Sequence, residues 1–430
     1  MNTRVAPAPV HRRGSRPRVQ TPQNDLARAV RRQSLAWWVA ANAVGLWLAA
    51  LLLWPQLGDH VAPLTYGRWM PLHLNWQLYG WCALPLVGVL LQSGLPAGAP
   101  RATQWARAAL WFWTAALALG GVSWLGGTTS GKLFLDWHGW ARPLLPAAMA
   151  FLWCVLAGHA SIRWRLFGAL GGWAYLGLLA ALAPVPWVLY WASGRSVYPS
   201  VNPHSGGATG ASLLGSTLGV IGVIHLVPLL LRLPRRSRVR GDGWVGGAWL
   251  LSWLVCGYVA GGPASHHATR QSAGLAVVLL WIPMLCWSLG RYRWTAGARP
   301  WLQAAGAWWM LLVASGWLIF LPGLSERLKF TNALVGHAHL AMAGFVTSAL
   351  LVVLNELQPE RPLRQGFGWW QLGSLAQVAV LLVSGWFENE QAAAFFSRTG
   401  GFYAVEVIRT TAGALMLLGS VALWREELRS

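Results

Sequence analysis

The chain is dominated by apolar runs that are long enough to cross a lipid bilayer. A helix needs about 20 apolar residues to span about 30 Å of hydrocarbon, and twelve such runs occur in the sequence. They cover residues 35–54, 73–92, 108–127, 143–161, 167–191, 205–231, 244–262, 273–290, 302–321, 334–354, 369–387 and 403–424. Backbone polar groups in lipid must be satisfied within the segment, which favours helices. We therefore predict an all-α polytopic membrane protein with twelve transmembrane helices.

The basic residues are distributed as membrane topology requires. The chain carries a net charge of +21, although only 10% of its residues are charged. With a cytoplasmic N-terminus, 24 Lys/Arg fall on the cytoplasmic side and 8 on the other. The cytoplasmic set includes the cluster Arg232, Arg235, Arg236, Arg238 and Arg240. This asymmetry follows the positive-inside rule, so it predicts an integral membrane protein with a cytoplasmic N-terminus and makes nucleic acid an unneeded partner.

Two regions are expected to differ in order. Residues 1–33 are rich in Arg, Pro and Gln without hydrophobic periodicity, which is typical of a disordered cytoplasmic tail. Residues 34–430 are expected to form one twelve-helix domain. The four cysteines lie inside apolar runs, and no Cys-x-x-Cys-His motif occurs. The chain is therefore predicted to carry no c-type haem of its own and to need a partner that delivers electrons.

Six histidines fall at one predicted depth, near the outer face of the membrane. They are His73, His204, His266, His267, His337 and His339. Ionisable residues inside membrane spans are costly and are functional candidates by default. The other five histidines are interpreted as solvated or packing residues.

The spacing of these histidines predicts more than one metal centre. His337 and His339 are two residues apart, so in a helix they point about 200° apart and face nearly opposite sides. One helix can thus serve two centres. The adjacent pair His266–His267 can turn toward one point and, with His204, supply three imidazoles, which suits copper or zinc.

Several sequence patches resemble the haem-copper oxidase superfamily, most closely the catalytic subunit of cbb3-type cytochrome c oxidases. The patches are Tyr66-Gly-Arg-Trp-Met-Pro-Leu-His73-Leu-Asn75, Lys329-Phe-Thr331 followed by Val335-Gly-His337-Ala-His339, Phe402-Tyr403 through Arg409 to Gly413, and Thr129-Ser-Gly-Lys132 with Leu135-Asp136-Trp137. The similarity runs from about Arg32 to the C-terminus. It implies the twelve-helix subunit I architecture of that superfamily.

The resemblance also implies a role for each histidine. His73 and His339 would be the axial ligands of a low-spin haem, and His337 the proximal ligand of a high-spin haem. His204, His266 and His267 would hold a copper ion. The implied cofactors are two b-type haems and one copper. Arg409 is either a partner of haem propionates or half of a helical ion pair with Glu406. Arg68, Lys132 and Lys329 are further propionate candidates or solvated loop cations.

Tyr258 resembles the redox-active tyrosine of the family, with an ordinary buried tyrosine as the alternative. In this chain Ala264 and Ser265 separate Pro263 from His266, where the family has the histidines directly after the proline. Two extra residues turn a helix by about 200°. A local bend at Gly261, Gly262 and Pro263 is therefore expected if Tyr258 is to keep its place.

The function implied by the resemblance is electron transfer from an external donor, a partner subunit or c-type cytochrome, through the low-spin haem to a haem-copper site that reduces oxygen. Nitric oxide reduction on the same scaffold is the main alternative. Tyr258 and the apparent lack of Glu or Asp near the copper histidines favour oxygen. A non-catalytic haem or copper sensor and a twelve-span transporter are further alternatives.

Overall fold

The computed structural model describes residues 22–95, 100–236, 242–397 and 399–429. It contains twelve helical segments long and apolar enough to cross a membrane. This confirms the predicted all-α class and the predicted number of spans. No β-strand occurs in these four described ranges, where only two isolated bridges pair extended residues.

Several spans are built from more than one helix. In chain order the elements are α1 (Pro22–Leu53), α2 (Leu57–His60), α3 (Tyr66–Asn75), η1 (Trp76–Cys82), α4 (Ala83–Gly94), α5 (Pro100–Leu125), η2 (Gly139–Ala141), α6 (Leu144–Ala157), α7 (Ala160–Leu182), α8 (Val185–Ala192), α9 (Gly210–Leu230), α10 (Asp242–Ala260), α11 (Thr269–Leu275), α12 (Val277–Gly290), α13 (Arg299–Phe320), α14 (Leu324–Leu328), α15 (Asn332–His339), η3 (Leu340–Val346), α16 (Thr347–Leu357), α17 (Phe367–Phe387), α18 (Ala392–Ser397) and α19 (Gly401–Arg429).

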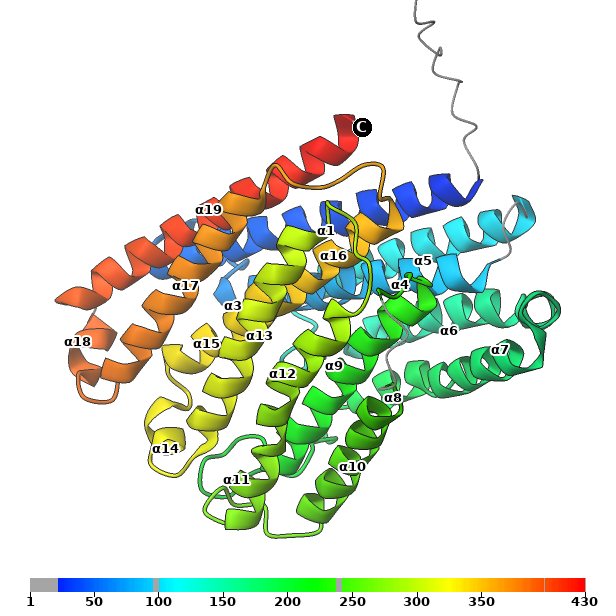
Figure 1. Cartoon of the computed structure of the whole chain (residues 1–430). Helices are drawn as coiled ribbons and strands as arrows, with labels where there is room; N and C mark the ends of the chain where they lie inside the picture. The colour runs from blue at the N-terminus through cyan, green and yellow to red at the C-terminus, as the bar shows by residue number, and fades with distance from the viewer. Residues whose placement is uncertain (1–21, 96–99, 237–241, 398, 430) are drawn as a thin grey trace, which may run out of the picture.

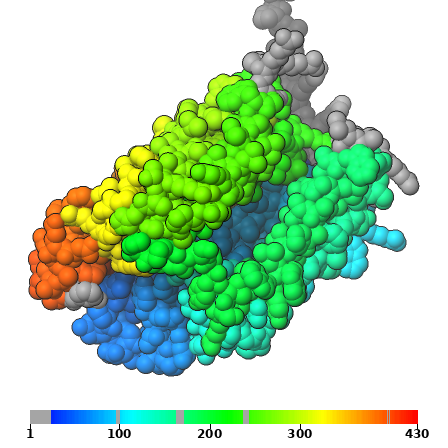
Figure 2. Space-filling view, turned by 90° about the horizontal axis from the view of Figure 1, so that it is seen from below, coloured from blue at the N-terminus to red at the C-terminus, as the bar shows by residue number. Residues whose placement is uncertain are grey.

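The long helices run alongside one another in a single bundle (Figure 1). The short helices α11, α14 and α18 lie toward the same end of the bundle, which we name the histidine end because the loops and the helices α3 and α15 toward this end carry the six candidate histidines. The C-terminal part of α19 lies at the opposite end (Figure 1). Seen from below, the surface is hollowed between the helices from α9 onward and the α6–α8 region (Figure 2). Apolar residues of α4, α6 and α9 line a cavity of about 350 Å³ in this region.

The first helix begins earlier than predicted. Residues 22–33, expected to be disordered, form the start of α1, whereas residues 1–21 of the predicted tail lie outside the described ranges. The reason is a fully buried ion pair, in which Arg31 Nη2 lies 2.6 Å from Glu427 Oε2 of α19. Arg31 also donates to the carbonyl oxygens of Gln358 and Arg361. A charge so well paired can be buried, which periodicity could not reveal.

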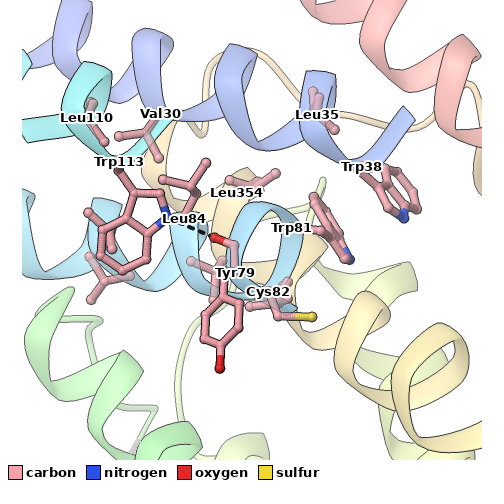
Figure 3. Packing of buried hydrophobic residues seen from close by; sticks show 14 of the residues in the cluster. Val30, Leu35, Trp38, Tyr79, Trp81, Cys82, Leu84, Leu110, Trp113 and Leu354 are labelled. Atoms are coloured by element: carbon pink, nitrogen blue, oxygen red, sulfur yellow. Dashed lines mark hydrogen bonds between the residues drawn. The ribbon is translucent and has the colours of Figure 1, made fainter. Parts of the chain in front are cut away.

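Aromatic packing fixes the helices next to the histidines. Trp38 of α1 stacks on Trp81 of η1 with ring centroids 4.3 Å apart, and Trp81 Nε1 donates to Thr347 Oγ1 at 2.9 Å. Trp113 Nε1 donates to the Tyr79 carbonyl oxygen at 2.9 Å (Figure 3). The buried indoles of Trp81 and Trp113 thus each find an acceptor. Together these contacts join α1, α5, η1 and α16 into one rigid core.

Two π-helical stretches follow two of the candidate histidines. One is η1, which begins three residues after His73, and the other is η3, which begins directly after His339. The Thr347 hydroxyl donates to the Met342 carbonyl oxygen five residues earlier at 2.8 Å. Short π-helical insertions are rare and frequently lie at functional sites. They therefore mark the region around these histidines independently of the histidines themselves.

Candidate functional site

His73 of α3 and His339 of α15 line the same cavity, which has a volume of about 90 Å³. His73 Nδ1 lies 2.8 Å from the Ala41 carbonyl oxygen, and His339 Nδ1 lies 2.8 Å from that of Val335. A carbonyl oxygen can only accept, so both Nδ1 atoms carry the proton and both Nε2 atoms keep a lone pair. No described residue forms a hydrogen bond with either Nε2. This is the arrangement expected of metal-ligating imidazoles.

The surroundings of His73 are shaped to its ring. A Cβ atom at Gly45 would lie 2.6 Å from His73 Cε1, so the imidazole occupies space that only a glycine leaves. The donor set fits a bis-histidine haem iron. The volume of the cavity, about 90 Å³, is smaller than the 300–1,000 Å³ typical of ligand sites. Met342 and Met416 belong to its lining, and such unbranched side chains adapt readily to a bound group.

His337 faces a different and larger cavity of about 570 Å³. Its Nδ1 lies 3.2 Å from Ser315 Oγ, and the Ser315 hydroxyl donates to the Leu311 carbonyl oxygen at 2.7 Å. Ser315 Oγ therefore accepts from Nδ1, leaving the lone pair on Nε2. His337 and His339 thus face different cavities, as their two-residue spacing on one helix predicted. Met342 contributes to the linings of both cavities, so the two cavities flank the same helix.

His204, His266 and His267 come together, as predicted, but in loops rather than in spans. Helix α9 begins only at Gly210 and α10 already ends at Ala260, so the predicted spans 205–231 and 244–262 were too long at this end. The ring centroids of His204 and His267 are 4.8 Å apart, and those of His266 and His267 are 4.3 Å apart. Phe320, whose ring centroid is 6.1 Å from that of His266, lines the cavity of His337.

Polar neighbours hold the three imidazoles in place. The Asn202 side chain contacts His266 Nδ1 at 2.8 Å, and its Oδ1 accepts the His204 backbone N–H at 3.2 Å. Ser265 Oγ lies 2.7 Å from His204 Nδ1 and accepts the His267 backbone N–H. His266 is fully buried, while the His267 side chain is about half exposed. The cluster thus has one face toward the protein and one toward the surface.

Glu326 of α14 completes this cluster, and the sequence analysis missed it. Its Oε1 lies 2.5 Å from His266 Nε2 and 2.9 Å from His267 Nε2. Ligand atoms of these three side chains lie within 4.8 Å of one another. The expectation that no Glu or Asp lies near the copper histidines is therefore wrong. Two imidazoles and one carboxylate form a donor set that is typical of non-haem iron, whereas three imidazoles suit copper or zinc.

The local backbone explains how Glu326 reaches the histidines. Gly323 has a φ of +82°, a left-handed conformation that favours glycine, and its N–H donates to Glu326 Oε2 at 2.6 Å. Burial raises the pKa of Glu326, but hydrogen bonds from backbone N–H groups and His266 outweigh it, so the pKa is lowered overall. The group is a carboxylate at neutral pH and is suited to a cation.

Tyr258 is not brought to the metal-ligand candidates. Helix α10 ends at Ala260, as the expected bend at Gly261 to Pro263 requires. The Tyr258 side chain nevertheless lies on the surface, 66% exposed. Its ring packs 3.7 Å from the Arg270 guanidinium carbon. The phenol therefore lies beside Arg270 on the surface, and the expected place for it beside the three histidines is not observed among the described contacts.

The propionate candidates fall into three groups. Arg409 forms the expected ion pair with Glu406 at 3.6 Å. Lys329 lines the His337 cavity and donates to Ser205 Oγ at 3.2 Å, and burial lowers its pKa. Lys132 instead donates to the carbonyl oxygens of Ala192, Gly194 and Val197, and Arg68 donates to that of Leu125. Lys329 is therefore the cation placed best for an anionic group in a described cavity.

A sequence signal for Glu326 did exist. The chain has only 12 acidic residues, so each one in a loop at the histidine end is conspicuous. Asn202 and Ser315 carry no comparable signal, because single polar residues in loops and spans are common.

No protein-family model matches this chain, and no curated protein matches it either.

Proposed function

We propose that this chain is the catalytic subunit of a membrane oxidoreductase in which electrons pass through a bis-histidine haem to a haem and a non-haem metal that together reduce a diatomic gas. The observation that carries the proposal is the grouping of the six histidines. Two share one cavity, one faces a second cavity, and three meet beside Phe320, which belongs to the wall of that second cavity.

The residues support distinct roles. His73 and His339 would hold one haem, which would supply electron transfer. His337, in the lining of the larger cavity, would hold the second haem. His266, His267 and Glu326, with His204 beside them, would hold the non-haem metal, which would supply redox chemistry beside that haem. Lys329 would meet an anionic edge of the haem.

Oxygen is the substrate that the family resemblance implies, and its product would be water. Oxygen reduction in the family uses a tyrosine at the site, whereas Tyr258 lies on the surface of this chain. A specific observation supports nitric oxide as the second candidate, because Glu326 contacts both members of the histidine pair. In that case the non-haem metal would be iron instead of the proposed copper. The electron donor would be a separate subunit or c-type cytochrome outside a bacterial-type inner membrane, with the N-terminus cytoplasmic.

The deciding experiment combines metal analysis with gas consumption. Purified protein should contain two haems, only one of which binds carbon monoxide in the reduced state, and one copper or one further iron. Oxygen and nitric oxide uptake are then measured with an artificial reductant. His267→Ala should abolish uptake, whereas His159→Ala should retain it, since His159 contacts only the Val155 carbonyl oxygen among described partners. Haem binding without uptake of either gas would contradict the proposal and support a sensor.

A further inference from the structure

A cavity of about 470 Å³ lies away from the six candidate ligand histidines, near the ends of α9 and α12 that adjoin the 231–236 loop. Its wall is formed mainly by apolar residues and glycines of α9, α10 and α12, and it also includes His225, Ser288, Arg235, Arg291 and Tyr292. His225 Nδ1 contacts the Ile221 carbonyl oxygen and Nε2 lies 2.7 Å from Ser288 Oγ. Both ring nitrogens are therefore satisfied inside the protein, and the wall offers mostly apolar surface.

The backbone brings several arginines together at the mouth of this cavity. Arg235 pairs with Tyr292 in an isolated antiparallel bridge. The Arg236 N–H donates to the Arg291 carbonyl oxygen at 2.8 Å, and the Arg293 N–H donates to that of Pro234 at 2.8 Å. Two short segments, each carrying two arginines, are thus fixed side by side. Concentrated positive charge of this kind is stabilised by an anion.

Aromatic residues place this mouth at the boundary between lipid and water. Trp244 and Trp287 are 50% and 40% exposed, with ring centroids 5.1 Å apart. The Arg291 guanidinium carbon lies 4.6 Å from the centroid of the Trp287 ring. Exposed tryptophans gather at the level of lipid headgroups. The charge distribution predicts that this is the cytoplasmic side. Arg238 and Arg240, also predicted to belong to the basic cluster, lie outside the described residues.

We propose that this cavity binds one anionic phospholipid. The guanidinium groups of Arg235 and Arg291 bind the phosphate, and an acyl chain fills the apolar interior. A volume of 470 Å³ lies within the range of ligand sites, and the anionic lipids of the cytoplasmic leaflet attract basic segments of membrane proteins. The site is independent of the proposed redox function, because it lies near the opposite end of α9 from His204.

The test is retention of lipid in the purified full-length protein. Native mass spectrometry counts bound phosphatidylglycerol and phosphatidylcholine after equilibration with mixed micelles of each. The wild type is expected to retain one phosphatidylglycerol preferentially. Arg235→Gln combined with Arg291→Gln should weaken its binding about 10- to 30-fold. The charge-matched control is Arg101→Gln with Arg425→Gln, two exposed arginines on the same predicted side, which should retain the lipid.

A second pair of variants tests the acyl-chain cavity without changing charge. Gly246 belongs to the wall, and a Cβ there would meet nothing within 4 Å. Gly246→Leu should therefore fill the cavity and displace the lipid. The neighbouring Gly247 also has open space around it but lies outside the lining, so Gly247→Leu should retain the lipid.

Two results would overturn the proposal. Equal retention of the anionic and the zwitterionic lipid would show that the arginines do not select a phosphate-bearing anion. Equal losses in the Arg235/Arg291 and Arg101/Arg425 double variants would show diffuse electrostatic attraction rather than a site. Unchanged haem content in every variant would confirm that the substitutions act on the lipid alone.

Discussion

The two groups of candidate ligands are held in different ways. His73, His337 and His339 lie inside helices, are largely surrounded by protein, and each directs Nδ1 to an acceptor of a neighbouring turn or helix. His204, His266 and His267 lie in loops, and they depend on Asn202, Ser265 and Glu326 from separate parts of the chain. The first group is fixed by secondary structure. The second is fixed where two loops meet the short helix α14.

The difference indicates which centre tolerates change. A helix-borne imidazole keeps its direction as long as its helix persists, because Cβ direction follows from helix geometry. A loop-borne imidazole keeps its direction only while its polar partners are present. We therefore expect losses at the helical sites to follow removal of the histidines themselves, and losses at the loop site to follow removal of their neighbours as well.

The largest effect is expected from His339→Ala. In the proposed function His339 is one of two ligands of one haem, so the haem content should fall from the proposed two per chain to about one. Haem extraction and the absorption spectrum of the reduced protein measure this. His159 has the same hydrogen bond, from Nδ1 to a carbonyl oxygen four residues earlier. If His159→Ala loses as much haem as His339→Ala, the helical hydrogen bond rather than the shared cavity explains the effect.

Glu326→Gln tests the loop site. The substitution keeps the shape but removes the charge next to His266 and His267, and we expect metal affinity to fall about 10- to 100-fold. Metal content after dialysis against graded chelator concentrations measures the change. The control is Glu390→Gln, which removes an exposed carboxylate paired with Arg327. Equal metal retention by wild type and Glu326→Gln would leave only the imidazoles as ligands.

Gly45→Ala tests the site of His73 by crowding the imidazole ring without removing any candidate ligand. The new methyl group would lie 2.6 Å from His73 Cε1, and overpacking of this kind costs about 1–3 kcal/mol. The thermal midpoint of unfolding should change, and so should the spectrum of the haem that we propose His73 and His339 to hold. Gly67→Ala, with nothing within 4 Å of the added atom, is the matched control. An unchanged spectrum in Gly45→Ala would mean that the His73 ring can move freely.

The smallest effects should separate the two groups most directly. Ser315→Ala removes the acceptor of His337 Nδ1, and Ser265→Ala removes the contacts to His204 and to the His267 backbone. A lost hydrogen bond costs about 0.5–1.5 kcal/mol. We expect Ser265→Ala to weaken metal retention more than Ser315→Ala weakens haem retention. The reverse order, measured on the same preparations, would contradict the view that the loop site depends more on its polar neighbours than the helical sites do.

Sequence reasoning succeeded where one periodicity decides the outcome. Apolar run length gave the helical class and the number of spans, and the two-residue spacing gave the opposite directions of His337 and His339. It failed where distant loops meet. Glu326 lies about 60 residues from His266, and no local pattern links them. It also failed at residues 22–33, where a buried partner on α19 compensates the charge of Arg31. Tyr258, expected near the histidines, lies on the surface although α10 ends just after it, at Ala260.

The pairing of Arg31 with Glu427 has a consequence for biogenesis. Helix α1 leaves the ribosome long before α19. Arg31 therefore lacks the carboxylate of Glu427 while most of the chain is synthesised. An unpaired charge at that buried position costs about 3–5 kcal/mol. A chain arrested before Glu427 would thus hold a loosened first helix. The ion pair that joins α1 to α19 therefore stabilises the bundle only after both helices have been synthesised.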